Sequence, residues 1–486
     1  MLQLFETHVP KTHPAVLPTG KAALGQYMTP APIAAFMASL FPKNFGAFHL
    51  LDAGAGEGSL TCSFLKALRH TDRSFPHGEA SLFEYDVDMA QKLEKNIIQA
   101  VEGLPVKPHI HHTDFIEYAS TLVLHKQRLF THAILNPPYK KISGHSAHRA
   151  LLRDAGIETV NLYTAFVALS LALLRPGGIL VAIIPRSFCN GPYYRPFRQY
   201  ILRHSAIRRL HLFTSRTEAF KEDKVLQENV ILVLERDAEQ SVLDVSTSKN
   251  GEMDEYREAR YPFEEIVRPG DPELFIHIPD NQGEQISLSG ADRSLKSLGV
   301  EVSTGPVVDF RLKEHLRAMP LPDDAPLLYP GHFNGKTKWP RADFKKPNAV
   351  ARCPETMKWL YPNGHYVVVR RLSSKEEKRR VVAYHVQPED FPGQPYLGFE
   401  NHLNVFHRRK QGLSPELAHG LALYLNSGFV DKLFRRFNGH TQVNATDLRS
   451  LPYPSADTLE ALGRWADGQT ELTQENVERH LKAVLA

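Results

Sequence analysis

Residues 50–60 read LLDAGAGEGSL, and this stretch decides the fold. An apolar run ends at an acidic residue, and three glycines follow at every second position before a helical pattern begins. Glycines at such a place let the backbone turn tightly and approach a ligand, with a helix N-terminus ready for an anionic group. The spacing is G-x-G-x-G rather than the G-x-G-x-x-G of dinucleotide binders. An ordinary tight turn without a ligand is compatible with the same sequence pattern. The stretch by itself therefore predicts a strand, a turn and a helix, and leaves the ligand open.

Similar apolar runs, bounded by Gly, Pro or Asp, lie on both sides of this stretch and are expected to be buried strands. The expected strands are 48–54, 80–86, 131–139, 178–185, 209–215 and 229–236. The expected helices are 29–41, 59–70, 87–100 and 161–174. Alternating strands and helices predict a parallel sheet with helices on both faces. The predicted fold class is therefore α/β, with a Rossmann-like domain over residues 1–236.

The rest of the chain has a different pattern. Residues 237–300 are acidic and rich in turn residues, and we expect a connecting region with a few short strands. Beyond it, apolar runs on either side of SSKEEK (residues 373–378) predict a hairpin. Further expected elements are a strand at 403–409, helices at 415–427 and 428–438, and a helical stretch at 457–485. We therefore expect an α+β domain over residues 301–486.

Composition limits the classes to which the chain can belong. With 486 residues, 42% hydrophobic and 23% charged, it is typical of two or three globular domains. No apolar run reaches the ~20 residues of a membrane span, and the first residues lack a secretory-signal pattern. The three cysteines, Cys62, Cys189 and Cys353, lie far apart, which excludes a disulfide framework and a C-x-x-C zinc site. We expect a cytoplasmic protein with no membrane partner.

Charge is unevenly distributed along the chain. Residues 1–236 hold 26 Lys and Arg against 19 Asp and Glu, and residues 301–450 hold 23 against 15. Between them, residues 237–300 hold 6 against 14. Two basic blocks separated by an acidic one predict two surfaces that grip a polyanion together. Two solvated faces of unequal charge are the alternative.

Polar and aromatic residues follow the ends of the expected strands. Glu84 ends the second strand, where an acid can accept both hydroxyls of a ribose. Asp114 and Phe115 follow the third, where they suit the amine and the ring of an adenine. Asn136 ends the fourth. Because open parallel sheets bind ligands at the carboxyl ends of their strands, these residues predict a nucleoside-binding site.

The segment NPPY, residues 136–139, predicts a catalytic turn made of Asn136, Pro137, Pro138 and Tyr139. Its prolines stiffen the turn and remove two N–H donors. The Asn136 side-chain oxygen and the Pro137 carbonyl can each accept a hydrogen from an exocyclic amine, which frees the nitrogen lone pair from conjugation with a purine. Tyr139 offers a face on which the base can stack. If the methyl donor is a sulfonium, its methyl group is already activated, so the amine needs no charged general base before the transfer. A purely structural Pro-Pro turn is the alternative.

Taken in order, GQYMTP (25–30), DAGAGEG (52–58), FEYD (83–86), TDF (113–115) and NPPY resemble the gamma-class adenine-N6 DNA methyltransferases of type II restriction-modification systems. The likeness is strong over about residues 20–236 and looser over 301–455. It implies a class I methyltransferase fold dependent on S-adenosylmethionine, with a C-terminal target-recognition domain. The cofactor-binding residues that it implies are Tyr27, Thr29 and Pro30 at the methionine end, Asp52, Ala53, Gly54 and Gly56 around the cofactor, Glu84 at the ribose, and Tyr85, Asp114 and Phe115 at the adenine.

The resemblance also implies an aromatic residue on the far side of a flipped target base, between the last two strands of the catalytic domain. Phe220 matches that place, beside Tyr139 on the near side. Phe213 is the competitor, but its strand context predicts a core residue.

Basic clusters lie near expected turns in the second basic block. One contains Arg379 and Arg380 and another contains Arg408 and Arg409, and all four are predicted to contact DNA. A solvated charged face is the alternative. The pattern HIHH (109–112) suggests metal ligands, but no third ligand is apparent, so a polar strand end is preferred and no metal is expected.

The predicted function is transfer of a methyl group from S-adenosylmethionine to N6 of an adenine flipped out of duplex DNA. Double-stranded DNA is the expected partner, a separately encoded restriction endonuclease is a possible companion, and a monomer is favoured. One alternative is N4-cytosine methylation, in which Ser more often stands at the place of Asn136. The others are methylation of RNA or of protein glutamine, and a catalytically inactive DNA-binding subunit.

Overall fold

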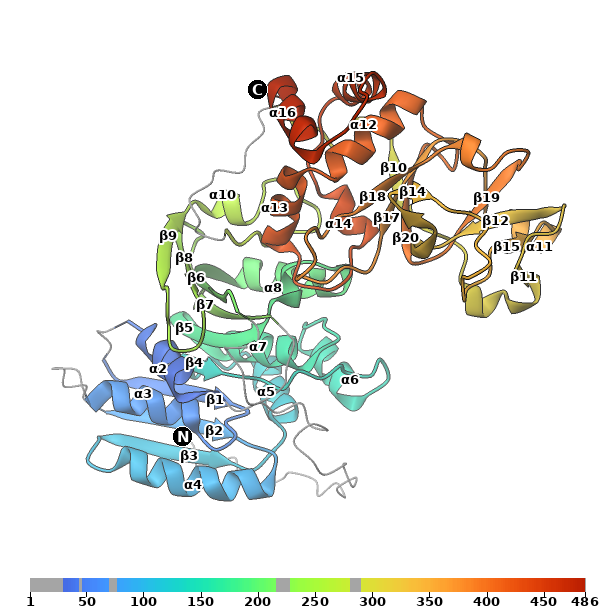
Figure 1. Cartoon of the computed structure of the whole chain (residues 1–486). Helices are drawn as coiled ribbons and strands as arrows, with labels where there is room; N and C mark the ends of the chain where they lie inside the picture. Colours follow the sequence, from blue (N-terminus) through green and yellow to red (C-terminus); the bar gives the residue numbers. More distant parts are fainter. Residues whose placement is uncertain (1–28, 43–45, 70–76, 216–227, 280–289, 486) are drawn as a thin grey trace.

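The chain folds into two parts, an N-terminal part with a nine-stranded sheet and a C-terminal part with smaller sheets and a group of helices (Figure 1). The computed structural model describes residues 29–42, 46–69, 77–215, 228–279 and 290–485. Among the helices in these ranges, none combines the length and the apolar character that a bilayer crossing needs.

The large sheet has the strand order β3-β2-β1-β4-β5-β7-β6-β8-β9. Its first five strands run parallel, and β7 is antiparallel to both of its neighbours. The strand order reverses between β1 and β4, which creates the switch point where open α/β sheets bind ligands. The strands are β1 (Phe48–Ala53), β2 (Gly78–Phe83), β3 (Val106–His111), β4 (Phe130–Leu135), β5 (Leu174–Pro185), β6 (Ser205–Phe213), β7 (Asn229–Arg236), β8 (Leu243–Ser248) and β9 (Arg257–Tyr261).

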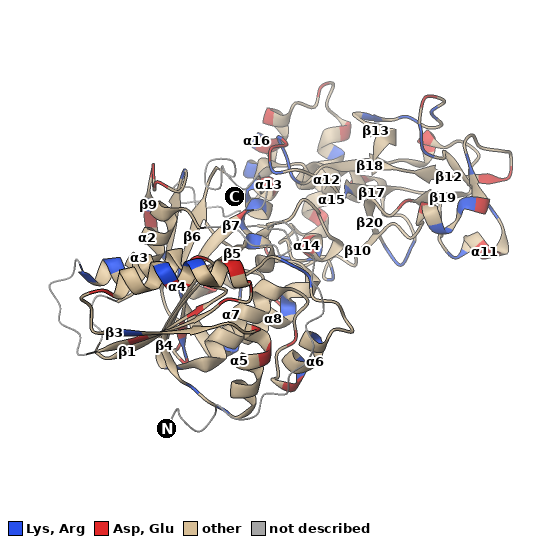
Figure 2. Cartoon of the chain, turned by 90° about the horizontal axis from the view of Figure 1, so that it is seen from below, with Lys and Arg blue, Asp and Glu red and all other residues tan. Residues whose placement is uncertain are grey.

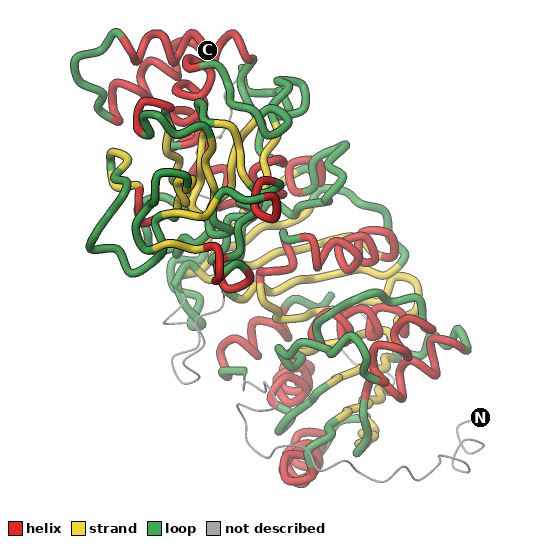
Figure 3. The backbone as a smooth tube through the Cα atoms, turned by 90° about the vertical axis from the view of Figure 1, so that its right-hand side faces the viewer, coloured by secondary structure: helices red, strands yellow, loops and turns green. Residues whose placement is uncertain are grey.

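Helices cover both faces of this sheet (Figure 3). Side chains alternate along β1, so Leu50 packs in a cluster with α2, α3 and α4, whereas Leu51 packs on the other face with α5 and α7. The helices of this part are α2 (Ala31–Ser39), α3 (Ser59–Arg69), α4 (Val87–Val101), α5 (Phe115–Leu124), α6 (Ala147–Asp154), α7 (Leu162–Leu173), α8 (Arg195–His204) and α10 (Phe263–Ile266). The sheet with helices on both faces confirms the predicted α/β, Rossmann-like class. This class could be predicted because strands buried on both faces need apolar residues at nearly every position.

The expected domain boundary at residue 236 is wrong. The large sheet continues beyond it, since β8 pairs in parallel with β6 and β9 pairs with β8. Arg209 on β6 pairs with two of the acidic residues of this segment, since its guanidinium lies 2.8 Å from Asp244 and 2.7 Å from Glu258. Farther along, Phe275 and Leu295 belong to the hydrophobic core of the C-terminal part. The segment 237–300 is therefore shared between the two parts and does not form a separate connector.

The C-terminal part contains a four-stranded sheet, β10-β20-β17-β18, and a five-stranded sheet, β11-β15-β12-β19-β16. The predicted hairpin is confirmed, since β17 and β18 pair antiparallel with Val368 opposite Tyr384. The strand predicted at 403–409 is β20, the two predicted helices are α12 and α13, and the last helical stretch is two helices, α15 and α16. The predicted α+β character is therefore confirmed.

The strands of this part are β10 (Glu301–Thr304), β11 (Leu316–Arg317), β12 (Asp324–Leu328), β13 (Phe333–Asn334), β14 (Lys336–Thr337), β15 (Ala349–Ala351), β16 (Leu360–Pro362), β17 (Tyr366–Arg370), β18 (Ala383–Val386), β19 (Tyr396–Phe399) and β20 (Leu403–His407). Its helices are α11 (Pro354–Met357), α12 (Pro415–Leu425), α13 (Gly428–Phe437), α14 (Ala445–Arg449), α15 (Ala456–Asp467) and α16 (Gln474–Leu485).

Two glycines let helices α12 and α15 cross closely. A Cβ added to Gly420 would lie 1.8 Å from the carbonyl oxygen of Leu459, and one added to Gly463 would lie 2.1 Å from that of Glu416. The clashing atoms belong to the backbone, so neither contact can be relieved by moving a side chain. Because α12 also packs against β17 and β18, the two glycines connect the helical group to the four-stranded sheet.

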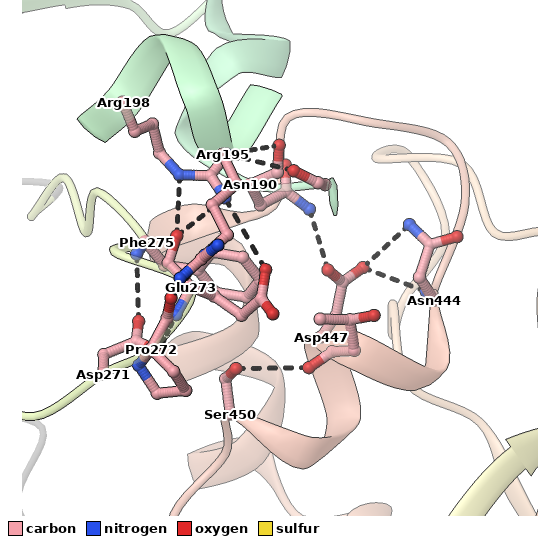
Figure 4. A network of polar contacts seen from close by, with 12 residues as sticks. Asn190, Arg195, Arg198, Asp271, Pro272, Glu273, Phe275, Asn444, Asp447 and Ser450 are labelled. Carbon is pink, nitrogen blue, oxygen red and sulfur yellow. Dashed lines mark hydrogen bonds and ion pairs between the residues drawn. The ribbon is translucent and has the colours of Figure 1, made fainter. Parts of the chain in front are cut away.

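Polar contacts join the two parts (Figure 4). Arg198 on α8 is fully buried, and its guanidinium donates to the main-chain carbonyls of Asn190 and Glu273 at 3.0 and 2.8 Å. The Asn190 side chain donates to Asp447 on α14 at 3.2 Å and accepts from the N–H of Gly439 at 3.3 Å. These directional bonds tie the end of β5 and the start of α8 to the C-terminal part.

Candidate active site

The glycine-rich turn follows β1 and is held by the neighbouring strand. The N–H groups of Gly54 and Ala55 donate to the carbonyl oxygen of Phe83, both at 2.9 Å. Gly54 and Gly56 have φ values of 75° and 57°, which favour glycine. A Cβ at Gly56 would have no atom within 4 Å, whereas a Cβ at Gly54 would lie 3.5 Å from Phe166 and 3.8 Å from Pro138. The turn therefore lies against the NPPY segment at one glycine and faces open space at the next.

Two buried acids flank this turn. Glu84 follows β2 and is 3% exposed, and its two carboxylate oxygens accept from the N–H groups of Gly56 and Asp86, both at 2.8 Å. Burial raises the pKa of Glu84, although these N–H donors oppose the shift. Asp52 in β1 accepts from the Thr61 hydroxyl at 2.7 Å, and burial raises its pKa to about 7. Glu84 thus joins β2 to the turn, whereas the Asp52 carboxyl is directed at α3.

A third acid, Asp114, caps helix α5 after β3. Its Oδ1 accepts from the N–H groups of Ile116 and Glu117 at 2.8 and 3.2 Å, and its Oδ2 lies 3.0 Å from Nε2 of His148. Burial alone would raise the pKa of Asp114, but His148 and the two N–H groups outweigh burial and lower it. The same hydrogen bond raises the pKa of His148. The sequence does not single out His148, because it lies on α6 in a segment without a motif.

The aromatic residues predicted to line an adenine pocket differ in exposure. Tyr85, which follows β2, is 52% exposed. Phe115 is buried, and its ring packs against those of Phe83 and Phe166 at centroid distances of 5.3 and 5.1 Å. Ala53 is also fully buried, so its side chain has no accessible surface. Of these predicted side chains, Tyr85 has the accessible surface that a ligand needs.

The NPPY segment follows β4, and its side chains are hydrogen-bonded to their surroundings. Nδ2 of Asn136 donates to Oγ1 of Thr29 at 3.0 Å, and Oδ1 of Asn136 accepts from the Tyr139 hydroxyl at 2.9 Å. The Tyr139 hydroxyl also lies 3.3 Å from the carbonyl oxygen of Ile183 in β5. Thr29 and Pro30 immediately precede α2. The structure therefore brings the predicted cofactor segment around Thr29 into contact with the predicted catalytic segment.

A row of rings leads from Tyr139 toward the C-terminal part. Successive centroids are separated by 6.1 Å from Tyr139 to Tyr163, by 5.9 Å from Tyr163 to Tyr194, and by 5.9 Å from Tyr194 to His440. The hydroxyls of Tyr163 and Tyr194 both contact the Ser187 hydroxyl, at 3.1 and 3.3 Å. The row therefore connects the NPPY segment with the loop after α13.

Arg380 does not lie on the surface. It is 2% exposed, and its guanidinium donates to Ser373 Oγ, to Asn438 Oδ1 and to the carbonyl oxygen of His440. The prediction that Arg380 contacts DNA is wrong, because all of these partners lie inside the C-terminal part. A turn between two strands was expected to expose both of its arginines, but these long-range contacts bury the second one.

The other predicted DNA contacts are accessible. Arg408 and Arg409 are exposed in the turn after β20, where Arg409 has a φ of 52°, and Arg379 is half-buried. Lys and Arg also gather along α13, between the two parts (Figure 2). One of them, Arg435, is ion-paired with Asp431 at 2.7 Å. The accessible positive charge of the predicted clusters is therefore at Arg379, Arg408 and Arg409.

Two predicted site residues, Tyr27 and Phe220, lie outside the described residues. Phe213 is buried and packs against His211 at 4.8 Å, which confirms it as a core residue. His109 lies 3.2 Å from Glu79 on the neighbouring strand. Over the ranges that the structure describes, no group of three His, Cys, Asp or Glu residues is placed to hold a metal ion.

The fold and the site together define a class of protein. A glycine-rich turn after β1, a buried acid after β2 and an Asn-Pro-Pro-Tyr segment after β4, on a sheet of this strand order, are the features of the Rossmann-like class I methyltransferase fold.

Comparison with known proteins identifies the family. The family model of the Eco57I restriction-modification methylase matches residues 66–220. The chain is 50% identical over 478 residues to the type II methyltransferase M.BsuBI of Bacillus subtilis, which covers 96% of this chain and 94% of that protein. It is 40% identical over 473 residues to the type II methyltransferase M.PstI of Providencia stuartii, with 94% and 92% covered. The DrdV–DNA complex aligns with a TM-score of 0.49 and 13% identity, over 91% of this chain and 57% of that one. The chain belongs to the type II methyltransferases, which confirms the family that its ordered motifs predict.

Proposed function

We propose that this protein transfers a methyl group from S-adenosylmethionine to the N6 amine of an adenine flipped out of duplex DNA. The observation that carries the proposal is that the glycine-rich turn and the NPPY segment lie close together. A Cβ added at Gly54 would lie 3.8 Å from Pro138, and within the NPPY segment the Tyr139 hydroxyl donates to Asn136. An amine acceptor, an aromatic ring and a ligand-binding turn lie together at the switch point of the sheet. Methyl transfer requires the base and the cofactor to meet at one such place.

The residues at the switch point fit the cofactor, which supplies an activated methyl group when it is bound. Gly56 faces open space, so the main chain of the turn is accessible to a ligand. Each oxygen of a carboxylate accepts more than one hydrogen bond, so Glu84 can take ribose hydroxyls while it holds the turn. The exposed ring of Tyr85 offers a surface to the adenine, and Asp114 offers a carboxylate to its amine.

The NPPY segment provides what the target amine needs. Oδ1 of Asn136 and the carbonyl oxygen of Pro137 accept the two amine hydrogens, which localises the nitrogen lone pair toward the methyl group. The Tyr139 hydroxyl, which lies 2.9 Å from Oδ1, gives up this acceptor when the base enters. The Tyr139 ring then stacks on the base, with Phe220 assigned to its other face.

DNA would be held by both parts of the molecule. Arg379, Arg408 and Arg409 place positive charge on the C-terminal part, where it can meet phosphates. The row of rings from Tyr139 to His440 joins the proposed catalytic segment to this part, and we assign target recognition to the residues after position 300.

We further propose that the protein acts as a monomer in the prokaryotic cytoplasm, where its methylation protects DNA from a separately encoded restriction endonuclease. Identity of 50% and 40% to two type II methyltransferases over nearly the whole chain supports the restriction-modification setting.

Methylation-sensitive long-read sequencing of DNA from cells that express the protein tests the proposal. We expect N6-methyladenine at one recurring sequence, and no such mark in cells that express Asn136→Ala at the same level. Modified cytosine would assign the protein to the N4-cytosine reaction instead. A genome without any new mark, despite folded protein, would contradict DNA methylation.

A further inference from the structure

The side-chain amide of Asn136 can accept a target amine with only one of its two ends. Its oxygen is an acceptor, whereas its nitrogen carries two donors. An amide turned by 180° about its last bond would therefore present N–H groups to the N–H groups of the amine. Productive methyl transfer requires that a neighbouring group fix the amide in one orientation.

Thr29 contacts the nitrogen end of this amide. Nδ2 of Asn136 donates to Oγ1 of Thr29 at 3.0 Å, and Thr29 is 8% exposed. Thr29 precedes Pro30, the N-cap residue of α2, and the Ile33 and Met37 side chains of this helix are fully buried in the sheet core. A hydroxyl held at the start of a packed helix is a fixed acceptor, so it can keep the amide nitrogen pointing away from the base.

Tyr139 identifies the place that the target amine will take. Its hydroxyl donates to Oδ1 of Asn136 at 2.9 Å, which is the geometry that an N–H of the amine also needs. The same hydroxyl lies 3.3 Å from the carbonyl oxygen of Ile183. When an amine replaces it at Oδ1, the hydroxyl can turn to this carbonyl, so the exchange leaves no hydroxyl hydrogen unsatisfied.

We propose that Thr29 is a positioning residue for methyl transfer, which holds Nδ2 of Asn136 so that Oδ1 faces the target amine. Tyr139 occupies that acceptor until the base arrives. The inference rests on the proposed function. It differs from the role that the motif resemblance implies for Thr29, a contact to the methionine end of the cofactor, and the two roles predict different responses to substitution.

Two substitutions separate these roles. Thr29→Val keeps the branched shape but removes the acceptor, and Thr29→Ser keeps the hydroxyl. The readouts are the single-turnover rate at saturating S-adenosylmethionine, on a duplex with the methylated sequence, and the cofactor Kd from calorimetry. We expect Thr29→Val to slow transfer by about 10- to 100-fold with an unchanged cofactor Kd, and Thr29→Ser to stay within about threefold of wild type. A weaker cofactor Kd with a normal saturated rate would overturn the proposal.

A double-mutant cycle then asks whether Thr29 acts through Asn136. If it does, Thr29→Val should slow the Asn136→Ala variant no further, because the amide that it orients is gone. Additive slowing in the double variant would overturn the positioning role. A slow Asn136→Ala variant beside a normal Thr29→Val variant would refute this inference alone, whereas a normal rate for Asn136→Ala would refute the proposed function itself.

Discussion

The large sheet and the C-terminal part place their polar residues by different means. In the sheet, Glu84 and Asn136 follow the carboxyl ends of β2 and β4, and the pairing of the strands sets where they lie. In the C-terminal part, basic residues lie in turns, where neighbouring residues can differ in burial. Arg380 is buried among hydrogen-bond partners, whereas Arg379 beside it is half-buried.

This difference implies that substitutions in the two regions should affect different properties of the protein. A strand end is supported by the backbone on which it lies, so removing the partly buried Asn136 side chain there should abolish chemistry with little effect on stability. A turn depends on its side-chain contacts, so substitutions there should divide into those that lower stability and those that weaken DNA binding.

The largest effect is expected at the end of β4. Asn136→Ala removes one acceptor for the target amine and should reduce methyl transfer by at least about 100-fold, the scale of one positioned polar group at a reacting centre. Single-turnover assays give the rate, and calorimetry with S-adenosylmethionine and urea unfolding should both match wild type. A variant that keeps near-normal turnover would place the active site elsewhere.

The next effect concerns the two adjacent arginines. Arg380→Ala should lower the free energy of unfolding by about 2–3 kcal/mol, because Asn438 and the His440 carbonyl lose a buried charged donor. Arg379→Ala, the matched control, should change it by less than about 0.5 kcal/mol. Urea denaturation measures both. Equal stability of the two variants would mean that Arg380 is not held as the hydrogen bonds indicate.

A smaller effect is expected in DNA binding. At least one of Arg408→Ala and Arg409→Ala should weaken binding to the recognised duplex by about 1–3 kcal/mol and reduce its salt dependence. Arg479 on α16 is similarly exposed, and Arg479→Ala serves as the control. Fluorescence anisotropy at several salt concentrations gives these values. If Arg408→Ala and Arg409→Ala both bind like the Arg479→Ala control and wild type, the turn after β20 is solvated surface and contacts no DNA.

The smallest effect is a pH dependence of stability at Asp114 and His148. The pKa of His148 is raised, so its contribution is complete below the unfolded value of 6.5 and is lost as pH rises through the folded value. The pKa of Asp114 is lowered, so its contribution is present above the unfolded value of 3.8 and is lost as pH falls through the folded value. His148→Ala should therefore lower the free energy of unfolding the most between about pH 4 and 6.5. The loss should be less than about 1 kcal/mol because the pair is partly exposed. Thermal unfolding of wild type and His148→Ala across pH 3–9 measures this loss. A stability difference that does not change with pH would contradict a stabilising interaction between Asp114 and His148.

The catalytic sheet was predictable because its signals are local. Buried parallel strands need continuous apolar runs, and the residues that follow them, such as Glu84 and Asn136, inherit their positions from the strands. β9 was not predictable, since its residues are largely accessible and it is placed by pairing with β8 and by Arg209.

Long-range contacts account for the other differences between the predicted and the observed structure. Arg379 and Arg380 are adjacent residues of the same type, and only the folding of the C-terminal part makes Arg380 a buried donor. Thr29 was predicted near the cofactor, but its hydrogen bond to Asn136 joins residues more than a hundred positions apart. Sequence spacing alone does not specify such pairs, because a side chain's partner is set by how distant elements pack.

The most direct test of the proposed methyl transfer is to follow the methyl group itself. Purified protein is incubated with duplex DNA and S-adenosylmethionine that carries a deuterated methyl group, and the DNA is digested to nucleosides for mass spectrometry. We predict that the label appears on N6 of deoxyadenosine, and that Asn136→Ala abolishes it. Label on deoxycytidine, or no label on any base from protein that binds the cofactor, would contradict adenine-N6 methylation at the NPPY segment.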